Sequence, residues 1–488
     1  MIGGNAAAGA PPSTGRIPYK WIALSNTTIG TLMAALDTNI VLIALPSIGR
    51  SLPGTSPVDV LWILIGYSLI TAVLLLSFGR LSDQFGRTRM YTLGFAVFTA
   101  GSALCSFSQT GSELVLFRLV QGLGAALLLS NAAAILTDAF PAHERGRALG
   151  VNQISIVIGA VSGLLLGGIL TGTLGWRAIF YVNVPIGIVA TVWSYYQLRE
   201  LADLDRVQHI DWVGNVSFGA GLTSLLAGVT FDALGVIPPN EFVFFLAAGV
   251  ALLALFVVVE RRSTHPMFDL KLFRLPVFAG STAAILLNSL ARGAFSFVIV
   301  FYLQGPPRFL NPLTAGLFLI PVSSALAVFG PISGILSDRY GTRPFAVLGL
   351  LVSASGFFWL TTITDTTPFL GLLPPFVLIG TGLGIFASPN RAAMMSSVPP
   401  RRRGVAAGTG TTLMNVGQTL SLGIAVLVLS RGIPTASLSA IFTGSSAQIP
   451  ASFSAGGFLS GIHFVFFISG LLLLAGVIPS ILRPEPMV

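Results

Sequence analysis

The sequence predicts an all-helical integral membrane protein with fourteen transmembrane helices. Of its 488 residues, 53% are hydrophobic and only 9% are charged, and the mean hydropathy is +0.86. A soluble domain carries about 25% charged residues. The low charge content excludes an ordinary soluble globular protein, a nucleic-acid-binding domain and a disordered chain.

The transmembrane segments are predicted from stretches of about 20 apolar residues, the length that a bilayer requires. The first stretch is too long for the apolar core of a signal peptide, so we expect it to be retained as a helix. An even number of spans places both chain ends on one side of the membrane. The fourteen stretches are 21–45, 60–79, 90–107, 114–137, 147–172, 178–198, 211–231, 242–259, 276–302, 312–336, 345–363, 369–395, 404–430 and 458–481.

The orientation follows from the basic residues, which membrane proteins concentrate in cytoplasmic loops. If the N-terminus is cytoplasmic, nineteen of the 26 Lys and Arg residues lie in cytoplasmic segments, four in outer segments and three within spans. We therefore expect a multi-pass protein of the cell (inner) membrane with both termini in the cytoplasm.

Two loops of similar sequence indicate an internal repeat, which is typical of secondary transporters. The first loop, Gly79–Arg89, reads GRLSDQFGRTR and follows the second span, whereas the second, Gly334–Arg343, reads GILSDRYGTR and follows the tenth. Eight spans separate the copies, so two helices are inserted between two six-helix halves. The predicted layout is a cytoplasmic tail (1–20), a first half (21–200), two extra helices (201–262) and a second half (263–488).

The Gly79–Arg89 loop resembles the signature loop of the major facilitator superfamily. Further segments resemble its 14-helix drug:proton antiporter family: LDTNIVLIALP at 36–46, RLVQGLG at 118–124 and WRAIFYVNVP at 176–185. In the fifth span, Leu164 stands where this family usually has proline. The resemblance implies two six-helix halves around a central cavity and proton-coupled export of drugs by alternating access.

Asp37 is the predicted proton-coupling residue because it is the only carboxylate well inside a span, where a charge is costly and usually functional. Burial favours the neutral form of a carboxyl group, so Asp37 could take up a proton near neutral pH. Arg118 lies at a compatible depth in the fourth span and is its expected partner. The alternatives are a permanent ion pair for Asp37 and a purely packing role for Arg118.

The cytoplasmic gate is expected in the first repeat loop, at Gly79, Asp83, Gly86 and Arg87. Asp83 is expected to dock on the positive N-terminal end of the thirteenth span, whereas Arg87 could simply follow the positive-inside rule. Small residues of the fifth span predict either a seam along which helices slide or ordinary helix packing; these are Gly159, Gly163, Gly167 and Gly168.

The substrate cavity is assigned through the resemblance to spans 1, 4, 9 and 12, with spans 2, 5, 10 and 13 as the moving helices. Arg292 is expected either to face Asp37 across this cavity or to bind an anionic group of the substrate, and Arg391 is expected to reach the cytoplasmic surface. The other polar candidates are Asn39, Tyr67, Gln121, Gln153, Asn288, Asn390 and Asn415.

The predicted function is proton-coupled export of hydrophobic or amphipathic drugs, cationic ones first, which would confer drug resistance. An exporter of an organic anion, a lipid or a siderophore-like metabolite is the alternative, and a channel is a further one. An intramembrane enzyme would need a nucleophile–base set or metal ligands, and the four histidines are scattered singly. We expect no cofactor, no nucleic acid and a monomer whose partners are a lipophilic small molecule, protons and membrane lipid.

Overall fold

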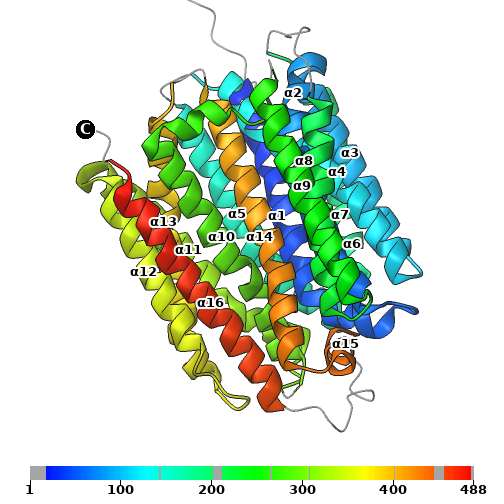
Figure 1. Cartoon of the computed structure of the whole chain (residues 1–488). Helices are drawn as coiled ribbons and strands as arrows, with labels where there is room; N and C mark the ends of the chain where they lie inside the picture. Colours follow the sequence, from blue (N-terminus) through cyan, green and yellow to red (C-terminus); the bar gives the residue numbers. More distant parts are fainter. Residues whose placement is uncertain are drawn as a thin grey trace, which may run out of the picture.

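The computed structural model is built from helices that run back and forth through one bundle (Figure 1). It describes residues 18–141, 144–201, 211–263, 266–306, 308–399, 402–443 and 455–484, so most of the predicted tail, residues 1–17, lies outside the described part. Fourteen helical segments are long and apolar enough to cross a membrane, which confirms the predicted fold class.

The first half and the extra pair account for the first eight spans. The first half comprises α1 (Tyr19–Ser51), α2 (Pro57–Phe85), α3 (Arg87–Phe107), α4 (Gly111–Ala139), α5 (Arg145–Thr173) and the sixth span, which is divided into α6 (Ala178–Tyr181) and α7 (Asn183–Gln197). The extra pair is α8 (Trp212–Ala233) and α9 (Pro239–Arg262).

The second half contributes the remaining six spans and two short helices that the hydropathy pattern does not predict. The short helices are η1 (Leu270–Arg274) and α15 (Thr435–Thr443). The spans are α10 (Pro276–Gln304), α11 (Pro312–Tyr340), α12 (Thr342–Leu360), α13 (Phe369–Ser396), α14 (Arg403–Gly432) and α16 (Ala455–Leu482).

The two repeat loops have the same backbone geometry. Gly86 ends α2 with φ 104°, and Gly341 ends α11 with φ 86°. Positive φ values are easily adopted only by glycine, so each loop turns the chain at its glycine and the next helix begins one residue later. The sequence repeat therefore corresponds to a structural repeat at equivalent ends of α2 and α11.

The halves meet along two pairs of helices, α5 with α11 and α2 with α14, and the extra pair packs beside α2 and α14 through α8. In Figure 1, α8 and α9 accordingly lie next to α14 and in front of the first half, and α1, α5 and α14 occupy the middle of the bundle. We call the side where α1 begins and α16 ends the termini side, and the opposite side the far side.

Glycines allow α5 to approach α1 closely. A Cβ atom at Gly159, Gly163 or Gly167 would lie 2.7, 2.6 or 2.9 Å from a backbone carbonyl oxygen of α1. Gly168 points elsewhere, because its Cβ would lie 2.7 Å from Cα of Leu313 on α11. Three of the four predicted packing glycines therefore join α5 to α1, and the fourth joins the two halves.

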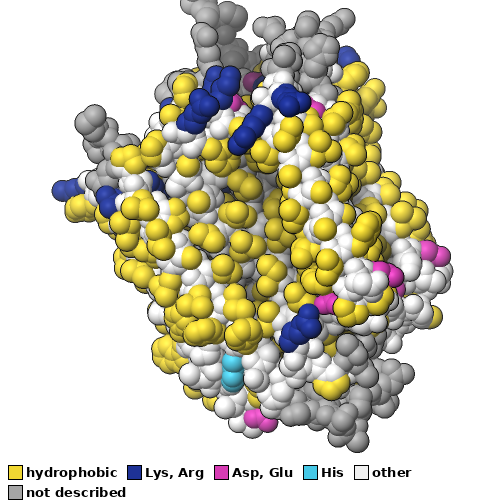
Figure 2. Space-filling model, in the orientation of Figure 1, with side chains coloured by type: hydrophobic (Ala, Val, Ile, Leu, Met, Phe, Trp, Pro, Cys, Tyr) yellow, Lys and Arg dark blue, Asp and Glu magenta, His cyan; other side chains and the backbone are white. Residues whose placement is uncertain are grey.

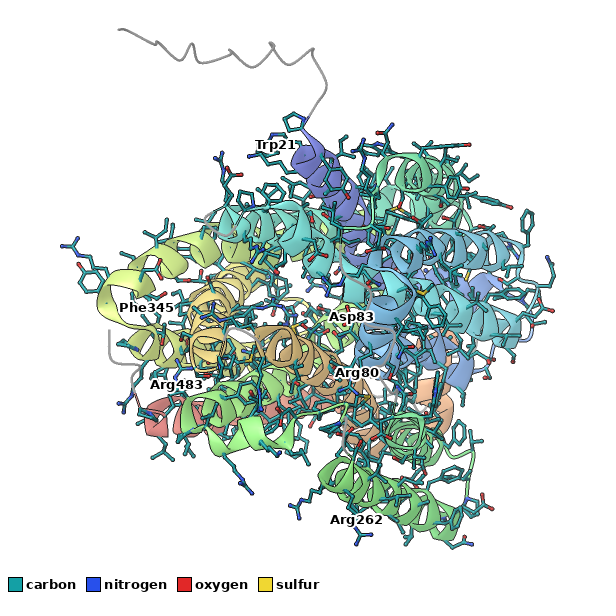
Figure 3. All side chains as sticks on the ribbon, turned by 90° about the horizontal axis from the view of Figure 1, so that it is seen from above. Trp21, Arg80, Asp83, Arg262, Phe345 and Arg483 are labelled. Atoms are coloured by element: carbon teal, nitrogen blue, oxygen red, sulfur yellow. The ribbon has the colours of Figure 1, made fainter. Side chains whose placement is uncertain are left out.

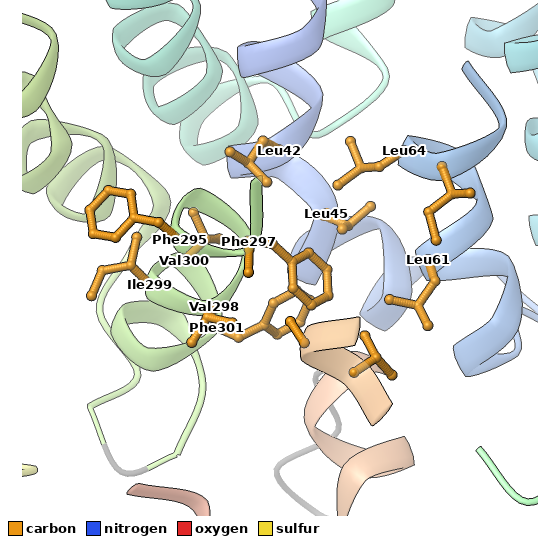
Figure 4. Close-up of a cluster of buried hydrophobic side chains, with 14 of the residues drawn as sticks. Leu42, Leu45, Leu61, Leu64, Phe295, Phe297, Val298, Ile299, Val300 and Phe301 are labelled. Atoms are coloured by element: carbon orange, nitrogen blue, oxygen red, sulfur yellow. The ribbon is translucent and has the colours of Figure 1, made fainter. Parts of the chain in front are cut away.

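On the far side the halves are sealed. Gln304 at the end of α10 donates a hydrogen bond to the carbonyl oxygen of Ile43 on α1 (3.0 Å). The short helix α15 of the second half packs against α1 and α2 of the first half. Figure 4 shows the surrounding apolar cluster, to which α1 contributes Leu42 and Leu45, α2 contributes Leu61 and Leu64, and α10 contributes residues 295 and 297–301.

Towards the termini side, four glycines on the helices that join the halves have open space beside them. A Cβ atom added at Gly79, Gly150, Gly330 or Gly404 would meet no other atom within 4 Å. These glycines lie on α2, α5, α11 and α14, the four helices that join the halves. The halves are therefore joined on the far side, whereas on the termini side these four positions of the joining helices face open space.

The outer surface suits a lipid environment. Large apolar side chains such as Tyr196, Leu370 and Ile335 are more than 70% exposed. Figure 2 shows such side chains over the whole middle of the visible face, with several Lys and Arg side chains near the upper, termini end. An apolar belt of this extent is expected of a protein surrounded by lipid rather than water.

We predict that Gly163→Ala destabilises the protein and that Gly150→Ala on the same helix does not. Both changes gain helix propensity, but only the Gly163 methyl group meets backbone, at 2.6 Å. Overpacking of this kind costs about 1–3 kcal/mol, which should lower the thermal unfolding midpoint in detergent. Equal midpoints for the two variants would contradict the close α1–α5 contact.

Candidate functional site

An ion pair lies at the centre of the first half. Arg118 on α4 donates from Nη1 to Oδ2 of Asp37 on α1 at 2.5 Å, and both side chains are 0% exposed. Taking one charge out of water without the other would be very costly. The two residues therefore stabilise each other's burial, and the structure brings together the two residues expected to couple protons.

Two amides complete the coordination of the Asp37 carboxylate. Gln121, one turn along α4 from Arg118, accepts a bond from Arg118 Nη1 (2.6 Å) and donates to Asp37 Oδ1 (2.8 Å). Asn183 at the start of α7 also donates to Asp37 Oδ1 (3.1 Å). Both amides donate to Ser102 Oγ on α3 as well. Residues of α4 and α7 thus bond directly to the carboxylate, and Ser102 of α3 bonds to the two amides that hold it.

The break in the sixth span helps to place Asn183. Proline has no backbone N–H, so Pro185 cannot bond to the carbonyl group four residues earlier, and a helix commonly breaks at such a point. α6 ends at Tyr181 and α7 begins at Asn183. The sequence motif at 176–185 contains Asn183, but its role as a partner of Asp37 was not predicted, because no sequence signal relates the two positions.

Arg118 is further enclosed by α2. Its Nε donates to the carbonyl oxygen of Ile63 (3.1 Å), and the Tyr67 ring lies 4.1 Å from the guanidinium carbon. A guanidinium group over an aromatic face gains a cation–π attraction. Among the residues that the structure describes, Nη2 of Arg118 has no hydrogen-bond partner. Tyr67 is buried, so it belongs to this cluster and not to the lining of a cavity.

Polar residues near the middle of several packed helices are nevertheless accessible. Thr38 is exposed although α1 is in contact with α2, α4, α5, α7 and α10. Gln153 on α5 and Arg391 on α13 are also exposed, and Arg292 on α10 and Asn415 on α14 are partly buried. Since these helices surround the interface of the halves, we call the accessible region between them the central space.

The predicted cavity residues therefore divide into two groups. Asn39, Gln153, Arg292 and Asn415 are accessible and border the central space. The other candidates, Tyr67, Gln121, Asn288 and Asn390, are buried. Tyr67 and Gln121 lie beside Asp37. Asn390 donates a hydrogen bond to the Ser281 carbonyl oxygen (3.0 Å) and accepts one from Arg483 Nη1 (2.6 Å).

The expectation that Arg292 faces Asp37 is wrong for this structure. Every side-chain partner of the Asp37 carboxylate comes from α4 or α7 of the first half, and Asp37 is fully buried. Arg391 also differs from expectation. Its Nη1 approaches Oε1 of Gln153 across the interface (3.4 Å), so it points towards the other half and not only to the surface.

The predicted gate loop forms a second ion-pair cluster on the termini side. Arg87 Nε donates to Asp83 (2.9 Å), and Arg87 Nη1 donates to both carboxylate oxygens of Asp138 at the end of α4 (2.9 and 2.7 Å). Asp83 is thus bound by Arg87 of its own half. The predicted docking of Asp83 on the start of α14 is not what this structure shows. Asp138 was not predicted as a gate residue.

The two glycines of this loop behave differently. A Cβ atom at Gly86 would lie 2.7 Å from the Glu200 carboxylate, which accepts bonds from Thr88 N and Oγ1 at the start of α3. A Cβ atom at Gly79 would meet nothing, so no close helix approach uses that glycine here. Figure 3 shows the termini side from above, with Asp83 and Arg80 labelled beside each other.

Comparison with known proteins agrees with this architecture. The model of the Major Facilitator Superfamily matches residues 27–208 and 212–422. The chain is 30% identical over 401 residues to the riboflavin transporter RibZ of Clostridioides difficile (strain 630), covering 82% of this chain and 86% of that protein. It is 32% identical over 428 residues to the tetracenomycin C resistance and export protein of Streptomyces glaucescens, covering 86% and 78%.

Among solved structures, a bacterial homolog of the human lysosomal transporter Spinster, in an inward-facing and unoccupied conformation, has the same fold. Its TM-score is 0.69 at 15% sequence identity, covering 96% of this chain and 98% of that one. The family match covers most of the chain. The protein therefore belongs to the major facilitator superfamily and is a membrane transporter, not an enzyme.

Proposed function

We propose that this transporter is a proton-coupled exporter of hydrophobic or amphipathic small molecules, with Asp37 as its proton site. The observation that carries the proposal is the fully buried pair of Asp37 and Arg118. A buried carboxyl group has two stable states: ionised when it is paired with the arginine, and protonated when it is separated from the arginine. Exchange between them provides a switch that a proton gradient can drive without any cofactor.

The contacts of the pair suggest how protonation could move helices. Asp37 belongs to α1, whereas its partners belong to α4 and α7. Neutral Asp37 no longer attracts Arg118, and Arg118 is then left as an uncompensated buried charge. A change in the packing of α1 against α4 would relieve that charge, and α1 also carries contacts to the second half on the far side.

The orientation supports export from the cell interior. The excess of basic residues on the termini side favours a cytoplasmic location for that side, and hence the inner membrane with both ends inside. In this structure the far side is closed, so the central space would be accessible from the cytoplasm. The binding partners are then a lipophilic substrate taken up from inside, protons from outside and membrane lipid, and the protein works as a monomer.

The substrate class has two candidates. The resemblance to drug:proton antiporters favours cationic drugs, and two relatives are a riboflavin transporter and a tetracenomycin C export protein. An organic anion is the second candidate, and a specific observation favours it, namely the accessible arginines of the central space.

We predict that Asp37→Asn abolishes substrate-driven proton movement. Asn keeps the size of the side chain and can still accept a bond from Arg118, but it does not titrate. The assay uses inside-out vesicles with a pH-sensitive dye, prepared with the wild type or the variant. A lipophilic cation, tetraphenylphosphonium, is added first, and then an organic anion, the sulfonate of the dansyl fluorophore (dansylsulfonate). Whichever probe moves protons in the wild type should fail to do so with Asp37→Asn. Asp365→Asn makes the same change in an exposed loop and is the matched control, which should keep the proton movement. Intact coupling in Asp37→Asn would refute the proton site.

We also predict that Arg118→Gln destabilises the protein more than the double variant Asp37→Asn with Arg118→Gln. Removal of one partner from a buried ion pair costs about 3–5 kcal/mol, because the other charge stays buried without compensation. The second change removes that charge and restores part of the stability. Thermal unfolding of both variants in detergent measures the difference, and additive effects would show that the residues are not energetically coupled.

A further inference from the structure

We infer that the substrate is an organic anion and that Arg292 provides its counter-charge in the central space. The inference deepens the proposed function and rests on it only in assuming that substrate passes through this space. It differs from the cationic substrate that the family resemblance suggests.

Arg292 carries a charge in the middle of the bundle, where the described part of the chain offers it no bonded partner. It lies in the central part of α10, and none of the described residues forms a hydrogen bond or an ion pair with it. Its neighbours are packed tightly, since Ala291 is 0% exposed and a Cβ at Gly293 would lie 2.7 Å from Cα of Gln418. Arg292 itself is partly buried but not fully enclosed. A charged side chain at this depth is usually paired with an opposite charge or with backbone carbonyl groups. Arg292 has neither among the described residues, so a bound anion could take that place.

Arg391 provides a second positive charge nearer the termini side. Its chain neighbour Asn390 bonds to Ser281, eleven residues before Arg292 on α10, so the two arginines differ in depth by about 16 Å at 1.5 Å per residue. Arg391 is exposed and has one long contact, with the uncharged Gln153. An anion arriving from the termini side would therefore meet Arg391 first and Arg292 deeper in the bundle.

No acidic residue in the middle of the described helices around the central space is free to oppose these charges. The sequences of α5, α10, α13 and α14 contain no Asp or Glu, and in α1 the single acid is Asp37, which is already paired with Arg118. The acids of α2, α4 and α11 lie within the first or last few residues of each helix. A cationic substrate would thus be brought next to two arginines with no counter-charge, and like charges repel strongly in a low-dielectric site.

The chemistry of arginine defines the ligand class. A guanidinium group presents its N–H donors in a planar fork that matches the oxygen atoms of a carboxylate, sulfonate or phosphate. Such charge-assisted bonds are stronger than those to neutral acceptors. Transport would also carry charge, because an anion leaving the cell and a proton entering it both move positive charge inwards. The membrane potential would therefore assist both movements.

The test is direct binding to the purified full-length protein in lipid nanodiscs without a proton gradient. The probes are dansylsulfonate and dansylamide, which share a fluorophore and differ in charge, and tetraphenylphosphonium serves as the cation. We expect dansylsulfonate to bind more tightly than dansylamide. Arg292→Gln should weaken dansylsulfonate binding about tenfold or more, the range expected for hydrogen bonds to charged groups, and leave dansylamide binding unchanged.

Two variants control for loss of charge and loss of fold. Arg292→Lys keeps the positive charge and should retain most of the anion binding. Arg431→Gln removes a positive charge from an exposed far-side position and should have no effect. Arg391→Gln should weaken dansylsulfonate binding less than Arg292→Gln does. The inference is overturned if tetraphenylphosphonium binds as tightly as dansylsulfonate, or if Arg292→Gln leaves the preference for the anion intact.

The outcomes separate this inference from the proposed function. Arg292-dependent anion binding together with intact proton coupling in Asp37→Asn would refute the proton site alone. Proton coupling that depends on Asp37 and is driven by tetraphenylphosphonium but not by dansylsulfonate would refute the anionic substrate alone.

Discussion

The buried pair of Asp37 and Arg118 is the interaction on which the first half depends. Two opposite charges, each 0% exposed, can exist there only because each compensates the other. The pair fixes how α1 and α4 face each other, and the amides of Gln121 and Asn183 add α7 to the same site. A change in one proton at this point alters the balance of forces among several helices at once.

Close helix contact makes this enclosure possible. A Cβ atom at Gly101 on α3 would lie 2.7 Å from Cα of Gln121, so a larger residue there would separate α3 from α4 and withdraw Ser102 from the amides. On the opposite face of α1, glycines at 159, 163 and 167 let α5 approach the same helix. Small residues that allow backbones to meet are the usual basis of helix packing in membranes, where burial of apolar surface gives little driving force.

The two halves are electrostatically unlike each other, although their helices repeat. The first half contains the compensated pair, and the second contains Arg292 and Arg391 on the side that borders the central space. The position of Asp37, sixteen residues into the first predicted span, corresponds to that of Arg292 in the ninth. One repeat position therefore holds the residue proposed to bind the proton in one half, and the residue proposed to bind the substrate in the other.

The sequence by itself determined the fourteen helices, the repeat of the Gly79–Arg89 loop, and the depths at which Asp37 and Arg118 could meet, because hydropathy and helical rise depend on residue order alone. Only the tertiary structure decided that Asn183 also reaches Asp37 and that Arg292 does not. It also decided that Arg483, which follows the last predicted span, is 2% exposed and donates a hydrogen bond to Asn390. The physical reason is that the rotation and tilt of each helix, which decide where a side chain points, follow from packing between helices distant in the sequence.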